Sequence, residues 1–140
     1  WSSDVCSSDL SAPMTWNINR DAGSNSSMVN NGVDTSVIVF AIDGNYRIED
    51  ALNSMLKDYS KKSKNYKLIK PASYTAVGSK KGYRAVFSYE DNQGLAYIMD
   101  IFICNDGNNC VQCILDTPIE YYGAKNIKIF ETVIDSVNVK

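Results

Sequence analysis

The 140-residue chain contains no histidine, and this absence excludes a large class of chemistry. Imidazole is the usual general base, the usual partner of a serine or cysteine nucleophile, and a frequent metal ligand. No apolar run reaches the roughly 18 residues that a membrane-spanning helix needs. The sequence therefore argues against an enzyme built on a Ser-His or Cys-His pair, and we expect no catalytic residue, no metal and no cofactor.

Neither sign of charge is in large excess, because the chain has 14 lysines and arginines and 16 aspartates and glutamates. A nucleic-acid binder usually carries a basic excess, so we expect no nucleic-acid partner. One local cluster of lysines lies around the middle of the chain. A solvated helix end explains it at this net charge, and a surface for an anionic partner is the alternative. Its members are Lys57, Lys61, Lys62, Lys64, Lys67, Lys70, Lys80 and Lys81.

The first ten residues, WSSDVCSSDL, have neither the charged start nor the apolar run of a secretory signal. They resemble the translation of a common sequencing adapter, TGG AGT TCA GAC GTG TGC TCT TCC GAT CT, followed by one base of insert. We therefore expect residues 1–10 to be an artefact without a domain role, and residues 11–140 to be a single domain. The true N-terminus, with any signal peptide or lipid anchor, then lies outside this sequence.

Local patterns predict the elements of the first half. Alternating Met14, Trp16 and Ile18 favour a strand over 11–20, and the Asn-, Ser- and Gly-rich stretch 21–32 is typical of a loop. The β-branched run 34–43 predicts a buried strand. A helix over 46–62, capped by Asn45, follows from apolar residues at helical spacing, and a strand over 66–78 is interrupted by Pro71. The helix stripe consists of Ile48, Leu52, Met55 and Tyr59.

Residues 81–116 predict a three-stranded antiparallel meander, because three segments alternate in hydropathy between turn residues. A three-residue loop ending at Gly94 pairs Tyr89 with Tyr97. A second three-residue loop, Asp106-Gly107-Asn108, pairs Ile103 with Val111 and Ile101 with Cys113. We prefer this register because it leaves one face apolar, whereas a two-residue Asp-Gly turn pairs Ile101 with Gln112.

The chain then predicts a last helix with Thr117 as its N-cap, Pro118 at its first position and Glu120 completing a capping box. Its apolar stripe consists of Ile127, Phe130, Ile134 and Val137. The order is strand-strand-helix-strand-strand-strand-strand-helix. We therefore expect the α+β class, with an antiparallel sheet of about six strands packed with two helices.

The order of elements over residues 16–140 resembles the PsbP-like superfamily. The likeness rests on the helix after the second strand, on the meander with GYRAVFSYEDNQG and LAYIMDIFI, and on the closing IDSVNVK, with Trp16 matching an early Trp. That group includes extrinsic photosystem subunits, DcrB-like proteins and small bacterial lipoproteins. The resemblance implies a non-enzymatic accessory or binding role, often outside the cytoplasm, and brings no catalytic residues.

Three cysteines lie outside the first ten residues. In the preferred register Cys104 and Cys110 are opposed at the mouth of a hairpin, close to disulfide reach, and Cys113 points to the other face. A disulfide between Cys104 and Cys110 and two free thiols remain open alternatives. Cys110-Val-Gln-Cys113 also has the spacing of a redox motif, but it lies within a strand and not at a helix start, where a thiolate is stabilised.

The second face of the meander is polar in the same register and carries Arg84, Asp100, Phe102 and Gln112. Arg84 and Asp100 are diagonal neighbours, as in a cross-strand ion pair on a solvated sheet face. The alternative is a polar platform that binds a ligand. If the face is open, these four residues are the candidate binding site for an unknown protein or a small polar ligand.

The sequence thus favours a non-catalytic binding or accessory domain of an extracytoplasmic protein, secreted or tethered to a membrane through a lipid anchor outside this sequence. A thiol-redox protein using Cys110 and Cys113 is one alternative. A structural domain of a larger lipoprotein is another.

Overall fold

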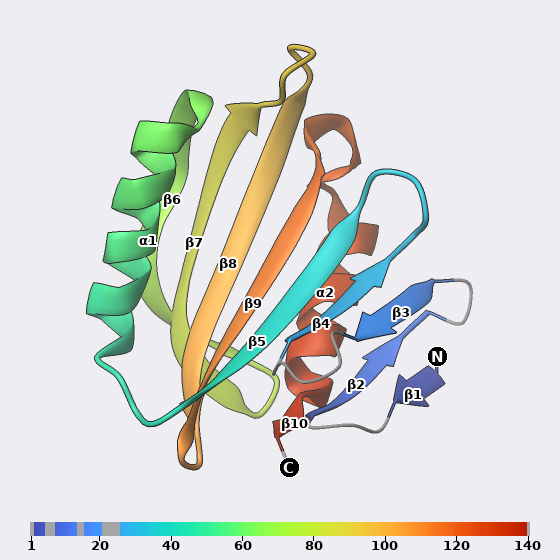
Figure 1. Cartoon of the computed structure of the whole chain (residues 1–140), viewed down its shortest axis with the longest axis vertical. Helices are drawn as coiled ribbons and strands as arrows, with labels where there is room; N and C mark the ends of the chain where they lie inside the picture. The colour runs from blue at the N-terminus through green and yellow to red at the C-terminus, as the bar shows by residue number, and fades with distance from the viewer. Residues whose placement is uncertain (1, 5–7, 14–15, 21–25, 140) are drawn as a thin grey trace.

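A computed structural model describes residues 2–4, 8–13, 16–20 and 26–139 as an α+β fold with two main helices. Its centre is a seven-stranded antiparallel sheet in the order β3-β4-β5-β9-β8-β7-β6 (Figure 1). The strands are β3 (Asn17–Arg20), β4 (Ser26–Asn30), β5 (Ser36–Asp43), β6 (Lys64–Val77), β7 (Lys80–Glu90), β8 (Ala96–Asp106) and β9 (Asn109–Pro118). The predicted class is confirmed, with a strand count slightly above the expected six.

A small second sheet joins the two ends of the chain, in the order β1 (Ser2–Asp4), β2 (Ser8–Ala12) and β10 (Asn138–Val139). Ser8 pairs with Val139 and Asp9 with Asn138, and β2 lies against the last helix. Ser8 and Asp9 therefore pair with the last strand, although we expected no domain role for residues 1–10; Trp1 and residues 5–7 lie outside the described residues. The origin of this stretch in an adapter stays a prediction.

The expected loop over 21–32 is partly wrong, because Ser26–Asn30 forms strand β4 between β3 and β5. Its alternation is short, with Ser27 and Val29 facing the core and Met28 facing outward. The strand is stabilised by pairing on both sides, which local composition does not reveal. The other part of the expected loop, residues 21–25, lies outside the described residues.

The β7–β8 register is confirmed, whereas the β8–β9 register is wrong by one residue. Tyr89 pairs with Tyr97, as expected for a loop that ends at Gly94, where φ is +80°. In the next hairpin Ile103 pairs with Gln112, and only Gly107 and Asn108 connect the strands. Gly107 has a φ of +62° at the first position of this two-residue turn, as in a type II′ hairpin, so Asn108 does not take the left-handed role.

Helix α1 (Ile48–Lys62) is confirmed, with Leu52 and Leu56 buried against the sheet. The predicted cap is wrong, because the helix begins two residues later than expected and Arg47, without a capping side-chain hydrogen bond, takes the position predicted for Asn45. The second helix differs from the prediction. Thr117 and Pro118 end β9, a short 3-10 turn follows at Ile119–Tyr121, and α2 (Ala124–Ser136) begins after Gly123. Thr117 does not cap the helix, because its side chain is buried and its Oγ1 lies 2.8 Å from that of Thr35 on the neighbouring loop.

The two helices pack on opposite faces of the sheet. Helix α1 packs on β6, β7 and β8 around Phe87, while α2 packs on the opposite face around Phe102 and Phe130. The α2 core includes residues from β4, β5, β8 and β9. Helix α1 leaves its face of the sheet open over β4 and β5. Helix α2 reaches the other edge of its face, because Val77 of β6 belongs to its core and Glu131 binds Arg84 of β7. Figure 1 shows α1 along one side of the sheet and α2 behind the other.

Neither helix, within the part of the chain that the structure describes, is long and apolar enough to cross a membrane.

Candidate functional site

Arg84 and Asp100, two residues of the expected platform, form a closed polar cluster beneath α2. Arg84 donates from Nε and Nη2 to the two carboxylate oxygens of Asp100 at 2.8 and 2.7 Å, and from Nη1 to Glu131 of α2 at 3.2 Å. The Tyr122 hydroxyl donates to Asp100 at 2.8 Å, and the guanidinium lies 5.4 Å from the centre of the Phe130 ring. The cross-strand ion pair is therefore confirmed.

Burial and charge shift the pKa values of Arg84 and Tyr122 in this cluster. Asp100 has no exposed surface, and the Arg84 side chain is 18% exposed. Burial by itself would lower the pKa of Arg84, but hydrogen bonds and charges from Asp100 and Glu131 raise it above its usual value. Burial and the Asp100 carboxylate raise the pKa of Tyr122, so its hydroxyl stays a donor at neutral pH.

The expectation that Arg84, Asp100, Phe102 and Gln112 form one open platform is wrong. Asp100 and Phe102 are completely buried, because α2 covers their part of the face. Gln112 pairs with Ile103 and so belongs to the opposite face of the sheet, a consequence of the one-residue register difference. Of the four residues, Arg84 lines a hollow of about 340 Å³ beside α2. Other residues that line this hollow are Lys70, Ser73, Thr75, Tyr122 and Glu131.

The structure overturns both cysteine pairings. Cys104 packs in the α2 core with Cys113, whereas Cys110 packs in the α1 core on the other face. Cys104 and Cys110 therefore form no disulfide, and Cys110 and Cys113 cannot act as a redox pair across the sheet; all three are buried free thiols. Burial raises the pKa of Cys104 to about 11 and raises those of Cys110 and Cys113 as well, which disfavours a reactive thiolate.

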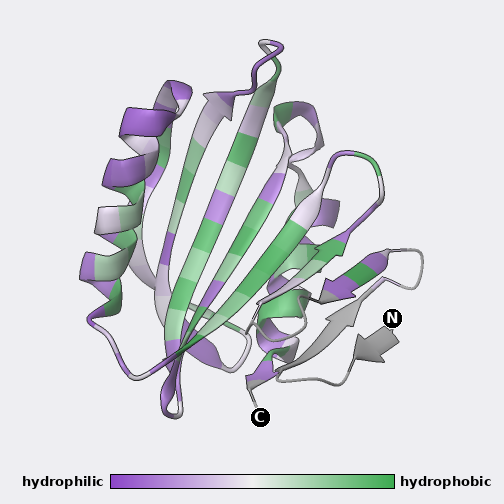
Figure 2. Ribbon diagram, viewed as in Figure 1, coloured by the Kyte–Doolittle hydropathy of each residue, from purple (hydrophilic) through white to green (hydrophobic). Residues whose placement is uncertain are grey.

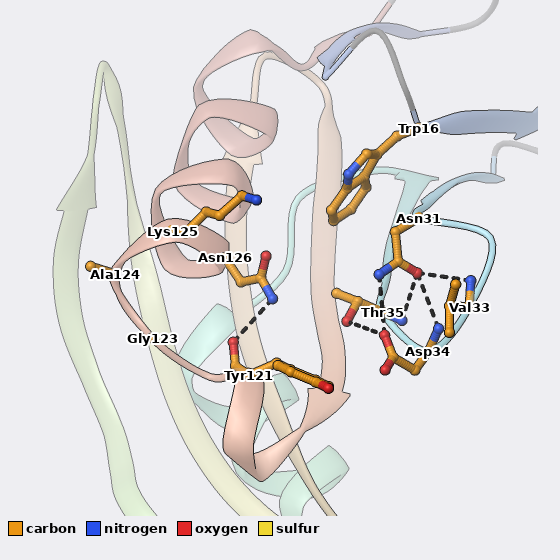
Figure 3. A pocket seen from close by; sticks show the side chains of 10 residues that line it. All are labelled: Trp16, Asn31, Val33, Asp34, Thr35, Tyr121, Gly123, Ala124, Lys125 and Asn126. Carbon is orange, nitrogen blue, oxygen red and sulfur yellow. Dashed lines mark hydrogen bonds between the residues drawn. The ribbon is translucent and has the colours of Figure 1, made fainter.

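A larger hollow, of about 590 Å³, lies where the chain enters α2 (Figure 3). Its walls come from three parts of the chain: Trp16 before β3, the loop between β4 and β5, and Tyr121 to Asn126 at the start of α2. In Figure 3 the Trp16 ring and the Lys125 side chain point into it from opposite sides. Polar and aromatic groups therefore share one concave surface, as is typical of binding sites. None of these residues was among the sequence candidates.

The loop between β4 and β5, residues 31–35, is held rigid by one asparagine side chain. Oδ1 of Asn31 accepts hydrogen bonds from the backbone N–H groups of Val33, Asp34 and Thr35 at 3.0, 3.1 and 3.1 Å. Nδ2 of Asn31 donates to Asp34 at 3.1 Å, and the Thr35 hydroxyl donates to the same carboxylate oxygen. Asn31-Gly32 is a recognisable turn signal, and it is the one sequence feature that pointed to this loop.

The rigid loop presents an apolar side chain to solvent. Val33 is 86% exposed at its tip, and Tyr121 across the hollow is 53% exposed. The same loop also lines a second hollow of about 520 Å³, with Tyr89, Tyr97 and Asp116 on its far wall. There the Tyr89 hydroxyl donates to Asp116 at 2.7 Å; burial raises the pKa of Asp116, and this hydrogen bond opposes the rise.

Across the residues that the structure describes, no group of three acidic or cysteine side chains is placed to hold a metal ion. The buried Asp100 and the partly buried Asp116 have partners within the fold, since Asp100 binds Arg84 and Tyr122, and Asp116 binds Tyr89. The residues that line the hollows offer hydrogen bonds, aromatic contact and charges of both signs.

Solved structures identify the fold. A cyanobacterial PsbP (CyanoP) from Synechocystis superimposes with a TM-score of 0.63 at 15% identity, covering 96% of this chain and 87% of that one. The fold is PsbP-like. No family model and no curated protein matches the sequence. The resemblance expected from the meander and the closing helix is thus confirmed at the level of the fold.

Two further solved structures are similar. A protein from Bacteroides thetaiotaomicron matches with a TM-score of 0.66 at 21% identity, over 95% of this chain and 45% of that one. LpqN of Mycobacterium tuberculosis, involved in cell envelope biogenesis, matches with a TM-score of 0.57 at 14% identity, over 94% of this chain and 83% of that one. This chain thus spans less than half the length of the Bacteroides protein.

Proposed function

We propose that this chain is a non-catalytic binding domain that serves as an accessory module of an exported protein or lipoprotein. It recognises a protein segment through the hollow at the start of α2. The observation that carries the proposal is the 31–35 loop, in which one Asn31 side chain holds three backbone N–H groups and so presents Val33 in a fixed position. A rigid loop loses little conformational entropy on binding, which favours affinity.

The composition of the hollow supports a protein segment as the partner. Trp16, Val33 and Tyr121 supply apolar and aromatic contact area. Asp34, Lys125 and Asn126 supply polar groups with one charge of each sign. Protein interfaces combine apolar contact area with polar groups, and aromatic residues are enriched there. A partner with one apolar side chain between polar groups fits this surface.

A non-catalytic role is supported by the way the ionisable groups are used. Arg84 and Asp100 neutralise each other beneath α2, and the three thiols are buried with raised pKa values. An extracytoplasmic location is supported by the likeness to LpqN, a protein of cell envelope biogenesis. A structural domain of a larger lipoprotein remains compatible with the longer Bacteroides chain. Upstream gene sequence that encodes a signal peptide or lipobox would test the location.

A random peptide library selected on the immobilised protein tests the recognition surface without knowledge of the natural partner. We expect the selected peptides to bind at least tenfold more weakly to Val33→Asp and to Tyr121→Ala, a loss of about 1.4 kcal/mol. Leu95→Asp is the matched control, because Leu95 is 55% exposed on the β7–β8 hairpin, outside the hollow. Equal affinity for Val33→Asp, Tyr121→Ala and the wild type would contradict the proposal.

A further inference from the structure

Strand β5 departs from the pattern of a half-buried strand. Val37, Val39 and Ala41 face the α2 core, so the residues between them should be polar on a solvated face. Instead, Ile38 is partly exposed and Phe40 and Ile42 are 37% and 40% exposed. Met28 of β4 pairs with Ile38 and is 36% exposed. We call these four residues, Met28, Ile38, Phe40 and Ile42, the open patch.

The open patch lies on the α1 face of the sheet, in the half that α1 does not reach. Phe40 pairs with Gln112 and Ile42 with Cys110, and Cys110 belongs to the α1 core. Helix α1 packs on β6, β7 and β8, so none of the described helices covers β4 and β5 on this face. Figure 2 shows apolar colour along β5 with no element in front of it. A row of exposed apolar side chains on one sheet face is a candidate interaction site.

The charge around the patch favours an uncharged, self-matching partner. Its polar neighbours on β4, β5 and β9 are the neutral Ser26, Asn30, Ser36 and Gln112. The nearest carboxylate on this face of β9, Asp116, lies at one end and is hydrogen-bonded to Tyr89. Two copies of such a surface meet without like-charge repulsion, whereas a strongly charged partner finds no complementary group.

The shape of the face also matches a second copy. Helix α1 forms a raised half and the open patch a lower half of the same face. Two sheets pack face to face about 10 Å apart, which is the layer that α1 occupies. A two-fold axis parallel to β5 places each α1 outside the β3 edge of the other copy, and the two open patches then face each other. Such an interface is isologous, as in most homodimers.

We propose that the open patch is the interface of a two-fold symmetric homodimer of this chain. The interface buries Phe40 and Ile42 of both copies, and it leaves the hollow at the start of α2 free because that hollow is built from the 31–35 loop and the α2 side of the fold. The dimer and the proposed recognition surface are therefore separate features, and either can fail without the other.

Light scattering coupled to size-exclusion chromatography, over a series of concentrations, tests the dimer on the full chain. We expect a dimer that dissociates on dilution, and at least tenfold weaker association for Phe40→Lys. Leu95→Lys is the control that adds the same charge at an exposed apolar side chain off the patch, and it should dimerise like the wild type. Because Phe40 is already 37% exposed, circular dichroism should show an unchanged fold for Phe40→Lys.

A wild-type chain that stays monomeric at all concentrations would overturn the dimer. So would a dimer that Phe40→Lys and the second patch variant Met28→Lys leave as tight as the wild type. Flotation with phosphatidylcholine vesicles tests whether the patch binds a lipid surface instead. A monomer that binds the vesicles, and loses this binding in Phe40→Lys, would assign the patch to a lipid surface and overturn the homodimer.

Discussion

At the scale of single residues, the Arg84–Asp100 pair shows what sequence alone could and could not predict. The alternation of β7 and β8 places the two side chains on one face, and the ion pair follows from that alternation. Its burial does not follow, because it depends on α2 returning over β8 from a distant part of the chain. A polar pair in a meander is equally consistent with a solvated face and with a buried, hydrogen-bonded cluster.

Loss of the guanidinium should therefore affect stability more than binding. Arg84→Ala leaves the fully buried Asp100 with Tyr122 as its remaining partner, and breaking a buried ion pair in this way typically costs about 3 kcal/mol or more. Urea unfolding measures the loss. Arg47→Ala is the matched control, since the Arg47–Asp50 side chains are 92% and 67% exposed, and we expect a change of at most about 1 kcal/mol. Equal effects of the two variants would contradict the structural role of Arg84.

At the scale of elements, the β8–β9 turn and the start of the last helix are two places where the structure differs from the prediction. Placing the left-handed residue at Asn108, when Gly107 takes that conformation, shifted β9 by one residue and exchanged its two faces. This shift places Cys110, Gln112 and Cys113 on the face opposite to the predicted one, whereas Cys104 on β8 keeps its face. The TPIE stretch has the pattern of a capping box, yet Thr117 continues the sheet, because pairing of β9 with β8 and β5 outweighs a local cap signal.

The true start of α2 offers a test at this scale. Gly123 precedes the helix with extended φ and ψ of −140° and −174°, has no capping side chain, and has open space where a Cβ would lie. Gly123→Ser should stabilise the fold by about 0.5 kcal/mol, because serine caps the helix and restricts the unfolded chain. Thermal unfolding measures the change. Gly82→Ala should do the opposite, since its Cβ would collide with the Ile103 backbone. Destabilisation by Gly123→Ser would contradict the assigned helix start.

At the scale of the whole molecule, the fold class could be predicted from hydropathy patterns, whereas the binding surfaces could not. The meander and the two amphipathic helices suffice to indicate the PsbP-like order of elements. The hollow and the open patch arise from which part of each face a helix covers, and this depends on contacts between distant segments. Val33 and Phe40 are ordinary apolar residues in the sequence, and only their exposure makes them informative.

In the proposed function, the chain presents the 31–35 loop and the start of α2 to a partner. The most direct test is a map of amide chemical-shift changes in the labelled protein, titrated with one of the selected peptides. We expect the largest changes on residues 31–35 and 121–126. Changes confined to the Arg84 side of β6 and β7, or to the open patch, with residues 31–35 and 121–126 unmoved, would contradict the proposed function.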